Sequence, residues 1–276
     1  MKKATKFKIR PLHIALLYAA AIVFFLAEAY NTKHLQYSFG FVGIGGTFRY
    51  HNAKLLGLSL YQILILATVA ISIGFSIARR RIAKRSLVGA ILFPLVIFAV
   101  CFVGAKLLYM VECYDLFRKN GLTFDGLSLF GAIFITPLFA FLVSLFRKDK
   151  TARLLDEIIY YELIMLCAIR TGCFLQGCCE GITLWKNAMP IVLPAQLIEV
   201  FLDLLILDFC IKLRDSKGRD GRMFPWFMML YGVARFLLEF IRSNPKTLLC
   251  FTNAQIFSVI CFVSGLLLLK YFTKRK

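Results

Sequence analysis

Eight apolar stretches alternate with short polar or basic segments along the chain. They cover residues 14–29, 55–78, 87–110, 123–145, 158–177, 191–213, 224–241 and 253–272. From the second stretch onward each runs for about 18–24 residues, which lets an α-helix cross the hydrocarbon core of a bilayer. The pattern therefore predicts an all-α polytopic membrane protein with about eight transmembrane helices.

The basic residues between these stretches fall on one side of the predicted membrane. Clusters of lysine and arginine lie at 1–10, 79–85, 147–150, 212–222 and 270–276. Cytoplasmic loops are enriched in these residues, and the order of the helices places every cluster on the same side. We therefore expect a multi-pass protein with a cytoplasmic N-terminus and a cytoplasmic C-terminus.

The N-terminal region is predicted to differ from the rest. Residues 1–54 would hold an N-terminal helix or signal anchor and an extracytoplasmic segment, and residues 55–276 would form one membrane domain. The sequence Ala27-Glu28-Ala29 has the small-x-small form of a signal-peptide cleavage site. A cleaved signal peptide and a retained helix both remain open, and we favour the retained helix.

Composition supports the membrane assignment. Hydrophobic residues make up 60% of the 276 residues, whereas soluble domains are about 45–50% apolar. The formal charge is +19, but the basic residues sit in short loops, where the membrane-orientation signal and anionic lipid headgroups explain them better than nucleic acid does. We expect no nucleic-acid partner and no cofactor.

One stretch combines an intramembrane charge, glycines and thiols. Residues 170–181 read Arg-Thr-Gly-Cys-Phe-Leu-Gln-Gly-Cys-Cys-Glu-Gly at the end of the fifth apolar stretch. An arginine there costs roughly 2.5–3.5 kcal/mol at the centre of a helix, which favours a bound partner. Gly172, Gly177 and Gly181 leave room for a close backbone approach or a ligand. The alternative is that Arg170 pairs with a helix-packing acid and that the small residues serve helix contact.

Two later helices place charges at a similar depth. Arg235, Glu239 and Arg242 are spaced i, i+4, i+7, and Gln196, Glu199 and Asp203 are spaced i, i+3, i+7, so each set is predicted to share one helical face. Together with Arg170, these side chains would form either internal salt bridges or an anion-binding chamber. Arginines favour phosphate, because the planar guanidinium donates two hydrogen bonds to adjacent oxygens. A phosphate at this depth indicates a phospholipid headgroup.

Four sequence blocks resemble the prolipoprotein diacylglyceryl transferases, and more closely their cysteine-containing relatives. The resemblance runs from about residue 55 to the end. The blocks are Arg-x-Gly-x-Phe-x-x-Gly-x-x-x-Gly at 170–181, Pro-x-Gln-Leu-x-Glu at 194–199, Tyr-Gly-x-x-Arg-Phe-x-x-Glu-Phe-x-Arg at 231–242, and Gln255 near the start of the last helix. Weaker matches lie at 104–109 and 126–131.

The resemblance implies a seven-helix transferase core in the bacterial plasma (inner) membrane, acting as a monomer. Its members move the diacylglyceryl group of phosphatidylglycerol to the thiol of a prolipoprotein lipobox cysteine. It implies catalytic roles for Arg170, Glu199, Arg235 and Glu239. It implies substrate-binding roles for Arg170, Arg235, Arg242, Gln196, Gly172, Gly177, Gly181, Tyr61, Cys173 and Cys178.

The chain departs from the family pattern at several of these positions. Phe130-Gly131-Ala132 stands where family members carry His-Gly-Gly, so the histidine proposed as a base is absent. Cys173 stands in place of an asparagine and Cys178 in place of an acid. The arginines that would bind lipid are all present.

Other interpretations remain open. The chain could be a catalytically altered relative that binds an anionic phospholipid, or a lipid transferase with another acceptor. A metal or redox site at Cys173, Cys178 and Cys179 is disfavoured, because C-x4-C-C lacks the usual C-x2-C pair and no histidine is near. Small packing residues are the preferred interpretation of these cysteines. A transporter is disfavoured because no inverted repeat is evident.

Overall fold

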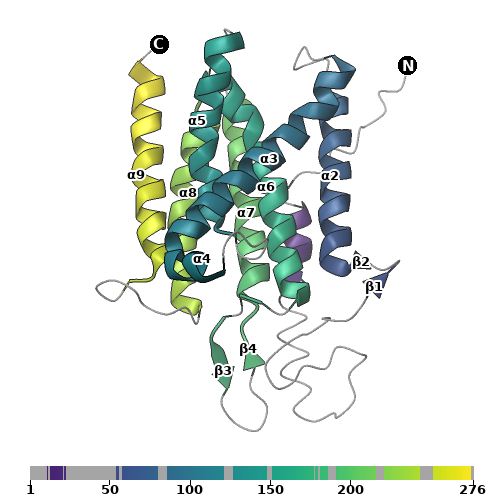
Figure 1. Cartoon of the computed structure of the whole chain (residues 1–276), viewed down its shortest axis with the longest axis vertical. Coiled ribbons are helices and arrows are strands. Elements are labelled where there is room, and N and C mark those ends of the chain that lie inside the picture. The colour runs from purple at the N-terminus through teal and green to yellow at the C-terminus, as the bar shows by residue number, and fades with distance from the viewer. Residues whose placement is uncertain are drawn as a thin grey trace.

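The computed structural model is an all-α membrane bundle (Figure 1), which confirms the predicted fold class. It describes residues 11, 13–20, 22, 54–55, 58–79, 86–120, 127–147, 151–176, 178–179, 181–185, 191–215, 221–242 and 251–274. The helices in this part of the chain are α2 (Leu60–Arg79), α3 (Leu87–Glu112), α4 (Tyr114–Asn120), α5 (Leu129–Arg147), α6 (Thr151–Gln176), α7 (Ala195–Asp215), α8 (Met223–Leu238), η1 (Glu239–Ile241, a 3-10 turn) and α9 (Asn253–Lys274).

Most of these helices match the predicted stretches. Five are long and apolar enough to cross a membrane, and they are α2, α3, α6, the α8–η1 segment and α9. Helix α5 supplies a shorter apolar segment, Leu129–Leu145. Helix α7 is as long as these but carries buried acids at Glu199, Asp203 and Asp208, which face the bundle interior as intramembrane charges usually do.

Some helix boundaries differ from the prediction. One helix extends into a polar segment, and another predicted stretch begins with a strand instead of a helix. Helix α6 begins at Thr151 rather than Ile158. Charged residues in its first two turns interrupt the apolar pattern, but these turns are still helical. Helix α7 begins at Ala195, directly after Pro194, and the residues before it include the strand β4 (Ile191–Val192). The polar segment between the predicted stretches 87–110 and 123–145 contains α4, a short helix that the apolar pattern did not indicate.

Helix α6 is the central element. Over an 18-residue apolar window of α6, 56% of the residues are buried inside the protein, against 17% for the corresponding windows of α2 and α9. The largest fully buried side chains include Tyr161 on α6 and Phe224, Phe227 and Tyr231 on α8. The buried hydrophobic cluster takes side chains from α3, α5, α6, α7, α8 and α9, and it fixes the helices that carry the polar residues.

Two local contacts determine how the helices pack around this core. Gly104 on α3 faces Gly131 on α5, and a Cβ on Gly131 would lie 2.1 Å from the Gly104 carbonyl oxygen, so only glycine permits this approach. At the start of α8 the carboxylate of Asp156 accepts hydrogen bonds from the backbone N–H groups of Gly221 and Phe224. A carboxylate at a helix N-terminus is stabilising, and it ties α8 to α6.

A small strand pair projects from the end of the bundle opposite the C-terminal end of α9 (Figure 1). Strand β3 (Thr183–Trp185) pairs antiparallel with β4. The Ile182 N–H donates to the carbonyl of Ile241 at 2.8 Å, and Gly181 forms a β-bridge with Arg242. The segment after α6 is thereby joined to the end of η1, which brings distant parts of the sequence together. A second pair, β1 (Lys54–Leu55) and β2 (Leu58–Ser59), precedes α2.

The described N-terminal residues 13–20 are helical and pack on the bundle. Ala15 is fully buried with Val200 and Leu204 of α7, and the hydroxyl groups of Tyr18 and Thr171 lie 2.8 Å apart. Most of residues 1–54 lie outside the described residues, so the division at residue 54 stays a prediction.

Candidate functional site

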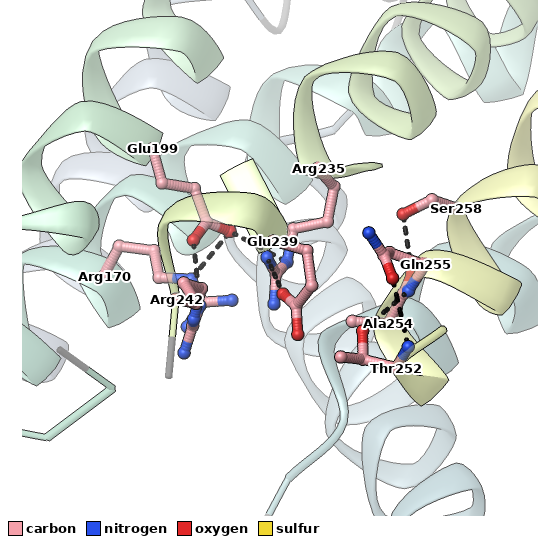
Figure 2. A network of polar contacts seen from close by, with 9 residues as sticks. All are labelled: Arg170, Glu199, Arg235, Glu239, Arg242, Thr252, Ala254, Gln255 and Ser258. Atoms are coloured by element: carbon pink, nitrogen blue, oxygen red, sulfur yellow. Dashed lines mark hydrogen bonds and ion pairs between the residues drawn. The ribbon is translucent and has the colours of Figure 1, made fainter. Parts of the chain in front are cut away.

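Three arginines from different elements surround one buried carboxylate. Glu199 of α7 lies 2.8 Å from the Nε of Arg170, 3.8 Å from the Nε of Arg235 and 3.5 Å from an amino nitrogen of Arg242. These residues come from α6, α8 and the residue after η1, and Figure 2 shows their guanidinium groups converging on Glu199. The predicted gathering of these side chains is therefore present in the structure, and we call it the arginine cluster.

The arginine cluster includes a second acid and is enclosed. Glu239 lies 2.6 Å from an amino nitrogen of Arg235, one helical turn before it. All five side chains are at least nine-tenths buried. Counted over these five side chains alone, three guanidinium groups against two carboxylates leave one excess positive charge, and the buried carboxyl of Asp203 lies close enough to Arg170 and Arg235 to interact with them electrostatically. Arg242 follows the end of the α8–η1 span, and burial, with Arg235 and Arg170 nearby, lowers its pKa below the ordinary value.

Arg242 reaches the cluster in a different way from that predicted. The spacing predicted a helical face that runs on to Arg242, but α8 narrows to a 3-10 turn at Glu239 and Arg242 itself is extended, with φ −108° and ψ 150°. Its β-bridge with Gly181 holds it in place. A Cβ on Gly181 would lie 2.7 Å from the Leu193 carbonyl oxygen and 2.8 Å from that of Ile241. Gly181 thus permits a close approach of three backbone segments.

The other predicted residues of α7 are buried beside the cluster. Gln196 and Asp203 are 2% and 1% exposed, and both lie on the Glu199 face of the helix. The amide nitrogen of Gln196 donates to the carbonyl of Cys178 at 2.5 Å, which anchors the segment after α6. Asp203 lies one helical turn after Glu199 on α7, and in the described part of the chain it makes no ion pair.

The cysteines after Arg170 form a compact group at the end of α6. The sulfur atoms of Cys173, Cys178 and Cys179 lie within 4.8 Å of one another. Hydrogen bonds from the Cys173 and Cys178 thiols, together with the Arg170 and Arg242 charges, lower the pKa of Cys179 below its ordinary value. Spacing alone did not indicate this group, which we call the thiol triad.

The remaining predicted positions are placed only in part. Gly172 is buried in α6, and Gly177 lies outside the described residues. Tyr61 belongs to α2, but its side chain is outside the described part. The binding roles implied for these residues stay predictions.

Phe130 occupies an apolar position next to the site. It is 4% exposed, and its ring packs on Phe134, Phe257 and, at 5.7 Å between centroids, on Tyr231. Tyr231 is itself buried close enough to interact electrostatically with Arg170 and Glu199. Phe130, where the resemblance predicts a histidine, thus contacts Tyr231 beside the cluster and offers no proton acceptor.

Gln255 acts within its own helix. The backbone N–H of Thr252 donates to the Gln255 side-chain oxygen at 3.1 Å, and the Gln255 N–H donates to the Thr252 hydroxyl at 3.3 Å (Figure 2). This reciprocal pair is a capping box for α9. The sequence contained the signal, because threonine followed three residues later by glutamine precedes an apolar run.

An apolar groove runs alongside the cluster. It has a volume of about 440 Å³ and lies between α7 and α8. Its lining includes Ala234 and Leu238, which flank Arg235 and Glu239 in sequence, and Leu202 and Ile206, which lie one and two turns beyond Glu199. None of the five cluster side chains lines the groove, but the same two helices, α7 and α8, carry the groove and two of the cluster residues, Glu199 and Arg235.

Together the fold and the site define a multi-pass membrane protein with a buried, net positive cluster beside an apolar groove. A family model described as prolipoprotein diacylglyceryl transferase matches residues 52–271. The chain therefore belongs to the prolipoprotein diacylglyceryl transferase family, as the sequence blocks predicted.

Similar proteins bear the name phosphatidylglycerol–prolipoprotein diacylglyceryl transferase. One from Dehalococcoides mccartyi is 29% identical over 174 residues, which cover 57% of this chain and 67% of that protein. One from Clostridium tetani is 23% identical over 235 residues, covering 77% and 93%. A protein from Clostridium perfringens, named as transferase 2, is 25% identical over 185 residues, covering 60% and 72%.

Proposed function

We propose that the protein transfers the diacylglyceryl group of phosphatidylglycerol to the thiol of a prolipoprotein lipobox cysteine. The observation that carries this proposal is the arginine cluster, in which Arg170, Arg235 and Arg242 meet around Glu199 with one positive charge in excess. A phosphodiester carries one negative charge, so the headgroup would neutralise the cluster. The names of the similar proteins specify the same donor and acceptor.

The groove supports a lipid rather than a free phosphate as the donor. A phospholipid needs a polar site for the phosphate and an apolar surface for its chains, and the groove between α7 and α8 lies next to the cluster. Leu237 and Val233, which line the groove, are also exposed on the outside of α8. A lipid could therefore enter sideways from the bilayer between these helices.

The cluster suits the chemical step. The acceptor sulfur forms a bond to the glycerol carbon, the C–O bond to phosphate breaks, and the electron pair leaves on glycerol phosphate. Guanidinium groups held in place before reaction stabilise the charge that develops on the leaving oxygen. Glu239 holds Arg235 at 2.6 Å and Glu199 contacts all three arginines, so the donors need little reorganisation.

A second candidate function is phospholipid binding without transfer. The observation that favours it is Phe130, which is packed in an aromatic group where the family pattern has a histidine. On this alternative the arginine cluster would bind the headgroup and no acceptor thiol would be alkylated. A transferase with another acceptor would instead form a different product from the same donor.

The proposed function also sets an orientation. The lipobox cysteine of an exported precursor is reached from outside the cell, so the end of the bundle with β3 and β4 would face outward in the plasma membrane. Both termini would then be cytoplasmic, and we propose a monomer as the active form. Membrane-impermeant labelling at Cys179, but not of a cysteine introduced at Lys150, would agree with this orientation.

The test uses the full chain purified in detergent micelles with labelled phosphatidylglycerol and a lipobox peptide. Wild-type protein should form the thioether-linked product. Arg235→Gln should retain the fold but lose about 100-fold to 1,000-fold in rate, as expected when one preorganised charge donor is removed. Arg118→Gln, which changes an exposed arginine on α4, serves as the matched control and should act like wild type.

The outcomes separate the candidates. Binding of phosphatidylglycerol without product in the wild-type protein would favour the binding function. Product formation that is unaffected by Arg235→Gln, with Arg235→Lys equally active, would contradict the role given to the cluster.

A further inference from the structure

The thiol triad differs in its exposure from the cysteines buried in the core. Cys101, Cys210 and Cys261 are completely buried in the apolar core, whereas Cys178 and Cys179 are exposed and Cys173 is half-buried. The three sulfur atoms lie within 4.8 Å of one another. Cysteines that serve only as small packing residues need not converge at an exposed surface, so this arrangement indicates a ligand-binding role.

The backbone holds the three thiols together. The Cys178 N–H donates to the Cys173 carbonyl at 3.0 Å, and Gln196 donates to the Cys178 carbonyl from α7. Cys179 adopts a left-handed conformation with φ 62°, which is uncommon for a residue with a side chain and costs about 1–3 kcal/mol in strained cases. Anchored, strained turns of this kind occur where side chains clamp a ligand.

We propose that Cys173, Cys178 and Cys179 bind one thiophilic divalent cation of the zinc type. Zn–S bonds of about 2.3 Å place sulfur atoms of a tetrahedral site about 3.8 Å apart, so the triad needs to contract by no more than roughly 1 Å. Three protein ligands and one exchangeable position are typical of zinc sites that perform chemistry.

The surrounding charge fits a metal bound by three thiolates. Such a unit carries one net negative charge, and two arginines lie at the same end of α6: Arg170, three residues before Cys173, and Arg242, which forms a β-bridge with Gly181.

This proposal rests on the proposed function for its chemical role. The acceptor cysteine binds the cation as the fourth ligand, and its thiol proton passes to solvent, because a metal-bound thiol is deprotonated. The bound thiolate then attacks the glycerol carbon, the S–C bond forms, and the C–O electron pair leaves with glycerol phosphate. The cation supplies the activation for which Phe130 provides no base.

Metal binding is tested without lipid or peptide. Full-length protein is purified in detergent with a non-thiol reductant and a chelator, then titrated with Co²⁺ and afterwards with Zn²⁺. We expect one Co²⁺ per chain with thiolate-to-cobalt charge-transfer absorption, which Zn²⁺ removes. Losing outer partners of a metal site costs 10–100-fold in affinity, so Cys173→Ser and Cys179→Ser should each cost more than about 100-fold.

Matched variants and a mass measurement make the test decisive. Cys113→Ser, which changes a half-buried cysteine at the end of α3, should bind Co²⁺ like wild type. Absence of charge-transfer absorption in wild type, or its persistence when all three cysteines are serine, overturns the site. An intact mass two units low with no metal bound under reductant identifies a disulfide and also overturns it.

The transfer assay separates this proposal from the proposed function. Metal-free protein should still bind phosphatidylglycerol but form product at least tenfold more slowly, and Zn²⁺ should restore the rate. Undiminished transfer by protein with all three cysteines changed would reject activation by the metal and leave the transferase function intact. Cobalt binding by a protein that makes no product would support the metal site and reject the transferase function.

Discussion

Replacing Glu199 by glutamine tests whether the arginine cluster is built to receive an anion. The carboxylate of Glu199 contacts Arg170, Arg235 and Arg242 at 2.8, 3.8 and 3.5 Å, and its side chain is 2% exposed. The substitution keeps the shape of the side chain but raises the excess charge of the cluster from one to two. We expect a less stable protein that an anionic lipid rescues.

The size of the effect follows from the burial of the groups. At about 4 Å and an effective dielectric constant of about 20, two unit charges interact by roughly 4 kcal/mol. Removing one partner of a buried ion pair costs about 3–5 kcal/mol, because the remaining charge stays desolvated. In a chain of this size each kcal/mol corresponds to about 2–4 °C in unfolding midpoint. A fall of about 6–20 °C in the unfolding midpoint is therefore expected for Glu199→Gln.

The assay is thermal unfolding in detergent with phosphatidylglycerol or phosphatidylcholine added. Phosphatidylglycerol should restore most of the lost midpoint, because its phosphate replaces the missing negative charge, whereas the zwitterionic lipid should not. Asp208→Asn on the same helix is the control, since its partner Lys212 is 59% exposed and can reach water. A midpoint equal to wild type, or equal rescue by both lipids, would refute the reasoning.

Three further tests, two of them with a matched control substitution, examine the scaffold around the site by the same unfolding measurement. Gln255→Ala removes the α9 capping box and should cost about 0.5–2 kcal/mol, whereas Gln255→Glu keeps an acceptor and should cost less. Gly131→Ala should cost at least about 1–3 kcal/mol by pushing α5 from Gly104, while Gly74→Ala, with open space around it, should be neutral or stabilising. Phe130→His should cost about 1–3 kcal/mol and give no gain in transfer rate, because an imidazole there is buried among aromatic rings.

The sequence predicted the features that depend on length, charge and spacing. Apolar stretches identified the helices because each must satisfy its own backbone in hydrocarbon. The charged residues on α6 and α7 converged as expected, because intramembrane charges turn toward one another. The family followed from motif order, and the match over residues 52–271 confirms it.

Features set by contacts between distant segments were not predictable in this way. Arg242 reaches Glu199 because the helix narrows at Glu239 and a β-bridge to Gly181 takes over, which no helical periodicity describes. The thiol triad depends on the left-handed turn at Cys179, so the C-x4-C-C spacing gave no sign that three sulfur atoms meet. The capping box at Gln255 was readable but was assigned only through the family pattern.

The charge of the arginine cluster bears on product release in the proposed reaction. A phosphodiester brings one negative charge and matches the single positive excess of the five ion-paired side chains. The leaving glycerol phosphate is a monoester with a charge near −1.5 to −2 at neutral pH, so the same guanidinium groups attract it at least as strongly as they attract the incoming lipid. Glu199 therefore has two effects on the proposed cycle: it holds three guanidinium groups in place for the incoming lipid, and its negative charge weakens their attraction for the product. Glu199→Gln should accordingly bind inorganic phosphate more tightly than wild type does, in a measurement that requires neither an acceptor peptide nor turnover.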